Sequence, residues 1–153
     1  MENGGGPAAG RAFKTLMDEL FEGPGAQDGM FLSKGSGIFP TLEKIDAESA
    51  SKEIEGSSVA AHAGHLLLYL EVLGGFLRGE VRTVDWEGRW KHRSVNKEDW
   101  DAIRSAIRDA VRSVEKGANQ VTIWDADQTT MAMSLAIHSA YHLGAIRQIA
   151  KHI

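Results

Sequence analysis

Two histidines four residues apart, His138 and His142, lie in the last apolar-periodic segment of this chain. In an α-helix each residue turns by roughly 100°, so positions i and i+4 are neighbours on one face. Both imidazoles fall at the centre of the apolar stripe of this segment, which is formed by Met131, Leu135, Ala145, Ile146 and Ile149. A pair of inward imidazoles at this spacing can share one metal ion.

A third histidine, His65, lies in the same way on a second expected helix, from possible caps at Ser57 and Ser58 to about Arg78. The apolar stripe centred on His65 consists of Ala61, Leu68, Tyr69, Val72, Leu73 and Phe76. His62 points roughly 60° away from this centre, nearer the edge of the stripe. The pattern therefore favours His65 over His62 as a ligand, and places His62 at the surface or beside the ligands.

If these two helices are neighbours, His65, His138 and His142 converge on one point. Three neutral imidazoles leave further coordination positions open for water or substrate, as in catalytic metal sites. Such a site suits zinc or nickel, and neither iron nor cobalt is excluded. The alternative is three core histidines without a shared partner, whose polar nitrogens would each need a separate hydrogen bond.

Composition fits one globular domain without a nucleic-acid or anionic-membrane surface. The chain has 153 residues, 42% of them hydrophobic, and a net charge of −4, whereas such surfaces need a basic patch. It contains no cysteine, so any metal must use nitrogen and oxygen ligands. We expect residues 1–10 to be a flexible N-terminus and residues 11–153 to be a single domain. The sequence shows neither a signal peptide nor an apolar run long enough for a membrane span, so we expect a cytoplasmic protein.

Four amphipathic segments predict an all-α, antiparallel (up-down) four-helix bundle. Besides the two helices above, periodicity predicts helices over Arg11–Phe21 and from an N-cap at Asn96 to an end at Gly117. A Gly-rich loop follows the first helix and leads to a short amphipathic piece with Phe39, Leu42 and Ile45. Residues 121–124 form a β-prone connection that is too isolated to build a sheet. Bundle cores of this kind often hold metals between facing helices.

Two motifs resemble those of the DinB/YfiT-like family. Residues 58–66, SVAAHAGHL, resemble the family's second-helix motif, in which the last histidine is a metal ligand. Residues 138–148, HSAYHLGAIRQ, resemble its closing motif, His-x-x-x-His followed by Leu-Gly and Ile-Arg. Residues 86–90, WEGRW, and 96–100, NKEDW, are similar to its Trp-rich connection and the start of its third helix. The resemblance covers nearly the whole chain from Arg11.

The resemblance implies an antiparallel four-helix bundle, often dimeric, with metal ligands at His65, His138 and His142. It also implies a divalent metal ion, with nickel or zinc expected, and a thiol S-transferase that uses a small bacterial thiol of the bacillithiol or mycothiol type on a small-molecule substrate. The family also contains isomerases. The present chain departs from the pattern by an extra histidine, His62, one turn before the expected ligand.

An open three-histidine site has two uses. A metal there can lower the pKa of a thiol or activate water, and the sulfur must come from a diffusible cosubstrate because the chain has no cysteine. The alternative function is a non-catalytic metal- or ligand-binding bundle, with a role in the stress response as one option. Tyr69 either donates a hydrogen bond near the metal or packs in the core.

The connection between the second and third expected helices is rich in tryptophan and charge. Arg89, His92 and Arg93 either bind an anionic substrate or form a solvated basic stretch. Trp86 and Trp90, with Trp100 just beyond, are expected to be hydrophobic lids or interface residues. Four tryptophans in a chain of this length indicate an apolar surface, and together with the family resemblance they predict a homodimer.

Overall fold

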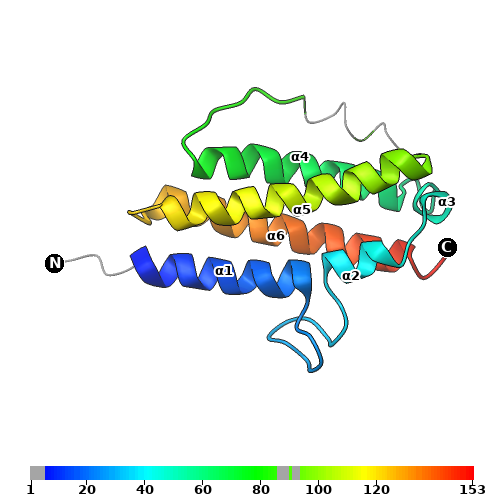
Figure 1. The fold of residues 1–153 in the computed structure, drawn as a ribbon, viewed down its shortest axis with the longest axis horizontal. Helices are drawn as coiled ribbons and strands as arrows, with labels where there is room; N and C mark the ends of the chain where they lie inside the picture. Colours follow the sequence, from blue (N-terminus) through cyan, green and yellow to red (C-terminus); the bar gives the residue numbers. More distant parts are fainter. Residues whose placement is uncertain (1–5, 86–89, 91–93) are drawn as a thin grey trace.

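The computed structural model of the chain describes residues 6–85, Trp90 and residues 94–153, and these form six α-helices and no strand. The helices are α1 (Gly6–Glu22), α2 (Ile38–Glu43), α3 (Ala47–Ala50), α4 (Val59–Leu77), α5 (Lys97–Gln120) and α6 (Ala126–Ile149). The all-α class predicted from the sequence is confirmed. The four long helices, α1, α4, α5 and α6, lie side by side, and the short α2 and α3 lie near one end of them (Figure 1).

Side-chain caps fix the starts of the three longest helices. Ser58 accepts a hydrogen bond from the Ala61 amide, Asn96 from the Asp99 amide, and Asp125 from the Gln128 amide. Each bond satisfies an amide that the first helical turn leaves without a partner. The caps expected at Ser58 and Asn96 are therefore present.

Two helix limits and one short helix differ from the sequence-based expectation. α1 begins at Gly6, ahead of the expected Arg11, and α3 was not predicted at all. α5 runs past the predicted end at Gly117 to Gln120. Gly117 is buried, and a Cβ there would lie 3.0 Å from Cγ of Arg78. This glycine lets α5 pack closely against the end of α4, so its role is close approach and not helix termination.

The order of helix directions departs from a simple up-down bundle. Arg78, just after α4, donates a hydrogen bond of 2.8 Å to Ser113 near the end of α5. At the opposite end, Val95 precedes α5 and bonds to Ser51 at the end of α3. α4 and α5 therefore run in the same direction, while α1 and α6 run the other way (Figure 1). The expected antiparallel order fails at this step because the connection over residues 78–96 is long enough to return to the starting end.

The core is a single apolar cluster to which all four long helices contribute. Trp100 on α5 is almost fully buried, and its indole N–H donates to the backbone oxygen of Ile45 at 2.7 Å. Trp124 packs beside Phe13, with ring centroids 6.2 Å apart. Trp100 is thus internal and Trp124 is half-buried against the core, so neither is a fully exposed apolar residue of the kind on which the homodimer prediction was partly based.

α4 is the most apolar helix of the described residues. By length and composition alone it could cross a membrane, contrary to the expectation that no segment is long enough. However, 72% of its apolar window is buried within the protein. A central core helix has this character, and here it brings two of the histidines into the interior.

Candidate metal centre

The histidines of α4 and α6 meet because these two helices are antiparallel neighbours. His62 and His65 lie on α4, and His138 and His142 lie on α6. His142 contacts both α4 histidines, whereas Tyr69, one turn further along α4, contacts His138. Residue numbers therefore rise along α4 in the direction in which they fall along α6. The imidazoles of the two helices meet across the contact between them.

Three imidazole nitrogens converge at His142. Its Nε2 lies 3.0 Å from Nδ1 of His65 and 2.9 Å from Nε2 of His138. Their ligand atoms all lie within 4.8 Å of one another, close enough to hold one metal ion. His65 and His142 are buried and His138 is half-buried. The three residues singled out from the sequence are therefore brought together by the fold.

The second nitrogen of His142 faces away from this convergence point. It is Nδ1, and it lies 3.0 Å from Nδ1 of His62. His62 is itself buried but is not among the three residues whose ligand atoms gather. Sequence reasoning placed His62 near the edge of its stripe and missed this contact, although its position one turn before His65 was a usable signal.

Two aromatic side chains cover the imidazoles. Trp90 stacks on His65, with ring centroids 4.3 Å apart and planes at 26°. Tyr69 stacks on His138, with centroids 3.6 Å apart and planes at 19°. The Trp90 ring also meets His62 edge-on. Trp90 and Tyr69 therefore pack on two of the three gathered imidazoles.

Burial keeps these imidazoles neutral. It lowers the pKa of His142 to about 2, with smaller contributions from the charges that His138, His62 and His65 would carry. Burial, followed by the charge of His65, lowers the pKa of His138 to about 4. The pKa values of His62 and His65 are also lowered, mainly by burial. At neutral pH each ring therefore keeps one lone pair, which is the state that binds metals.

Hydrogen bonding alone does not satisfy this arrangement. A neutral imidazole nitrogen carries either one N–H or one in-plane lone pair, yet Nε2 of His142 has two close nitrogen neighbours. At most one of the two contacts can therefore be a well-directed hydrogen bond to that atom. Nitrogens bound to one ion at about 2.0–2.1 Å are themselves about 3 Å apart, so the spacing fits a shared cation.

The gathered donors are all uncharged. Among the described residues, no carboxylate joins His65, His138 and His142 in the group that could hold an ion. A divalent cation held by three neutral ligands keeps its full charge, so the site would favour an anionic further ligand. This donor set discriminates against the oxygen-rich sites of calcium and magnesium.

A cavity of about 470 Å³ borders the histidine cluster through His62. Its wall combines apolar and polar side chains from the segment before α4 and from the C-terminal half of α6. The lining residues are Ile54, Glu55, Ser57, His62, Tyr141, Ala145, Gln148, Ile149 and His152. This cavity has room for a small molecule beside the ligands.

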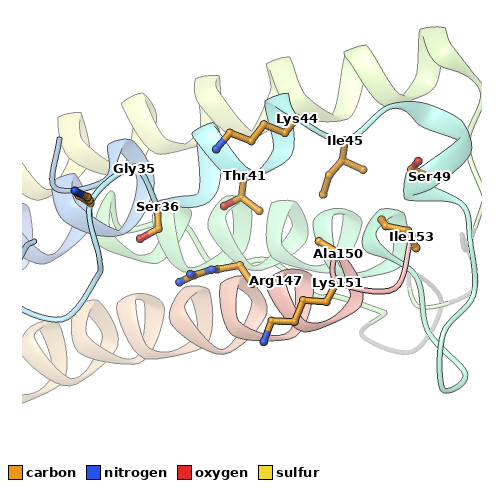
Figure 2. A pocket seen from close by; sticks show the side chains of 11 residues that line it. Gly35, Ser36, Thr41, Lys44, Ile45, Ser49, Arg147, Ala150, Lys151 and Ile153 are labelled. Atoms are coloured by element: carbon orange, nitrogen blue, oxygen red, sulfur yellow. The ribbon is translucent and has the colours of Figure 1, made fainter. Parts of the chain in front are cut away.

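A second cavity, of about 480 Å³, is lined by none of the clustered histidines. Figure 2 shows it with Thr41 of α2 and Lys44 just after α2 on one side, and with Arg147 of α6 and Lys151 just after α6 on the other. Its wall carries cationic and hydroxyl groups. Because it offers no imidazole, it is distinct from the candidate metal centre.

Several residues that the sequence pointed to lie outside the described residues. These are Trp86, Arg89, His92 and Arg93, so their proposed roles as lid, interface or anion-binding residues rest on the sequence alone.

No protein-family model, curated protein or solved structure matches this chain. The resemblance to the DinB/YfiT-like family therefore rests on the two histidine motifs and the tryptophan segments.

Proposed function

We propose that this chain is a DinB/YfiT-like helical bundle that binds one divalent metal ion, nickel or zinc, through His65, His138 and His142. The observation that supports it best is the convergence of three imidazole nitrogens on one point, two of them within 3.0 Å of the third. The family motifs independently select the same three residues.

The activity we propose is transfer of a low-molecular-weight thiol to an electrophilic small molecule. A divalent cation at a neutral three-histidine site lowers the pKa of a thiol in contact with it. The thiol loses its proton to water, its sulfur forms a bond to the electrophilic carbon, and the leaving group departs with the electron pair of the broken bond. The chain contains no cysteine, so the thiol is a diffusible cosubstrate of the bacillithiol or mycothiol type.

The chain's own side chains have three tasks in this scheme. The three histidines hold the ion from one side. Trp90 and Tyr69 cover the rings of His65 and His138 and keep bulk water away from them. The cavity beside His62 receives the small molecule, and fixing two reactants there would supply much of the rate through proximity.

The coverage by Trp90 favours a second candidate, a non-catalytic metal-binding bundle. The stacked Trp90 ring and the buried His142 leave little room for a substrate directly at the ligands. In that case the ion would serve stability alone, as in structural sites. The two candidates differ in whether a thiol reaches the metal.

Metal analysis of protein purified without a histidine tag tests the binding step. We expect about one ion per wild-type chain, and a nearly metal-free His142→Ala variant, because losing one of three ligands weakens binding strongly. His152→Ala is the matched control, since His152 is exposed and is not one of the three gathered histidines. Equal metal content in wild type and His142→Ala would overturn the ligand assignment.

Thiol binding and turnover test the activity. Thiols should change the visible spectrum of the cobalt-loaded protein, and metal-loaded protein should conjugate a generic electrophile with a bacterial thiol faster than chelated protein or His138→Ala. A cobalt spectrum that no thiol alters, together with no rate above the chelated control, would favour the non-catalytic bundle.

A further inference from the structure

The contact between His62 and His142 joins two nitrogens of the same type. The Nδ1 atoms of the two rings lie 3.0 Å apart, a hydrogen-bond distance, so one of them carries the proton and the other accepts it. Both rings are buried, which disfavours the charged imidazolium form and leaves each ring neutral. Each ring therefore carries one N–H, on either Nδ1 or Nε2.

The position of that proton decides whether His142 can bind a metal. With the proton on Nδ1 of His142, its Nε2 keeps a lone pair directed at His65 and His138. With the proton on Nδ1 of His62 instead, Nδ1 of His142 accepts it and the N–H of His142 must sit on Nε2. That N–H would then occupy the place of the ion.

We propose that His62 is a positioning residue that accepts the Nδ1–H of His142 and so holds His142 in the tautomer that presents the Nε2 lone pair. This inference rests on the proposed metal-binding function and extends it to a fourth histidine. Hydrogen bonds of this kind to the far nitrogen of a ligand histidine orient the ring and make it a better donor.

The surroundings of His62 fix it for this task. It is buried on α4 one turn before His65, and its ring meets Trp90 edge-on with centroids 5.3 Å apart and planes at 88°. Its own neutral proton then lies on Nε2, since Nδ1 is the acceptor. His62 also lines the cavity beside the centre, so a molecule bound there would contact the residue that orients His142.

Nitrogen NMR of the metal-free protein, with the histidines ¹⁵N-labelled, reads the tautomers directly. We expect His142 to carry its proton on Nδ1 and His62 to carry its proton on Nε2. The opposite assignment for either ring would overturn the proposal. Because no metal is present, this measurement judges the hydrogen bond even if the proposed metal function fails.

Metal affinity of matched variants tests the consequence. His62→Phe keeps a ring but removes the acceptor, and should weaken nickel or zinc binding by about 10–100-fold. His62→Asn places a carbonyl oxygen near the position of Nδ1 and should restore most of the affinity. His152→Phe, the control, changes another imidazole of the same cavity wall and should bind as the wild type does.

The outcomes separate the two ideas. Wild-type affinity in His62→Phe, or affinity in His62→Asn as weak as in His62→Phe, would overturn the role of His62. A wild-type protein that binds neither metal would overturn the proposed function itself, whatever the NMR shows. Circular dichroism of each variant shows whether a loss of binding reflects a loss of fold.

Discussion

Trp90 stacks on His65 with ring centroids 4.3 Å apart, so an indole lies directly against an imidazole that faces the candidate metal position. The other two described tryptophans are elsewhere: Trp100 packs in the core against Ile45, and Trp124 packs against Phe13. Of the described tryptophans, Trp90 alone stacks on one of the three gathered histidines, so its fluorescence should report on metal binding there.

Nickel or cobalt should therefore quench the tryptophan fluorescence of the protein as the site fills. Open-shell ions quench an indole at this range, and Trp90 is in contact with His65. Trp90→Phe should lose most of the metal-dependent change, whereas Trp124→Phe should keep it. A full metal response in Trp90→Phe would contradict the stacking.

The metal-free protein should lose stability as the pH falls below about 6.5. The pKa of His142 is lowered to about 2 and that of His138 to about 4 in the folded state, whereas the unfolded chain protonates histidine near 6.5. The unfolded state thus binds more protons below 6.5, and acid favours it. The stability is complete above pH 6.5 and is lost toward pH 4 and below.

Urea unfolding of metal-free protein at pH 7.5 and at pH 5 measures this effect. The midpoint should be lower at pH 5, and the difference should shrink in His138→Phe, which has no imidazole at that position to protonate. Carboxylates are common to both proteins, so the comparison isolates the histidine. A pH dependence identical in the two proteins would count against the buried neutral state of His138.

Replacing Gly64 or Gly74 of α4 by alanine should change the free energy of unfolding in opposite directions. A Cβ on Gly74 would lie 2.6 Å from Cγ2 of Val114 on α5, whereas a Cβ on Gly64 would have no heavy atom within 4 Å. Alanine gains about 1 kcal/mol over glycine inside a helix, but overpacking against a stiff valine costs about 1–3 kcal/mol. Gly64→Ala should therefore raise the free energy of unfolding, and Gly74→Ala should lower it. Stabilisation by both would show that α4 and α5 are not so closely packed.

A homodimer remains our prediction, now motivated by α6. Ile137 and Tyr141 lie one turn apart on this helix and are 70% and 61% exposed, so they form a pair of adjacent exposed apolar side chains that a second copy could cover. Light scattering at micromolar concentrations should give twice the chain mass, and Ile137→Lys should shift it toward the monomer. A monomer mass for the wild type would contradict the prediction.

The sequence predicted that His65, His138 and His142 lie together, and the fold confirms this, because helical periodicity depends only on local spacing. His138 and His142 share a face by the i, i+4 rule, and His65 lies at the centre of its own stripe. The same rule could not show that Nδ1 of His62 reaches His142, because that depends on how closely α4 approaches α6. Periodicity fixes the direction of a side chain, not the distance to its neighbour.

Other misses have the same origin in tertiary packing. Glycine is typical of a helix end, which is why the sequence predicted an end at Gly117. In the structure Gly117 lies inside α5, where its missing side chain makes room for Arg78 and Leu77. The local sequence pattern also could not predict that α4 and α5 run in the same direction. That direction depends on the end of α4 at which α5 begins. Caps such as Ser58 and Asn96 were readable because their partners lie within three residues.

The shared direction of α4 and α5 has a consequence for how the chain folds. Two helices that pack in the same direction cannot form by closing a hairpin at their junction, as neighbours in an up-down bundle do. α4 has 19 residues and is about 28 Å long at about 1.5 Å per residue, so the chain must traverse that length before α5 can dock. The entropy of closing this loop is lost before any contact between the two helices is gained. We therefore expect slower refolding than in a helical bundle with short connections, with the pairing of α4 and α5 as a late event.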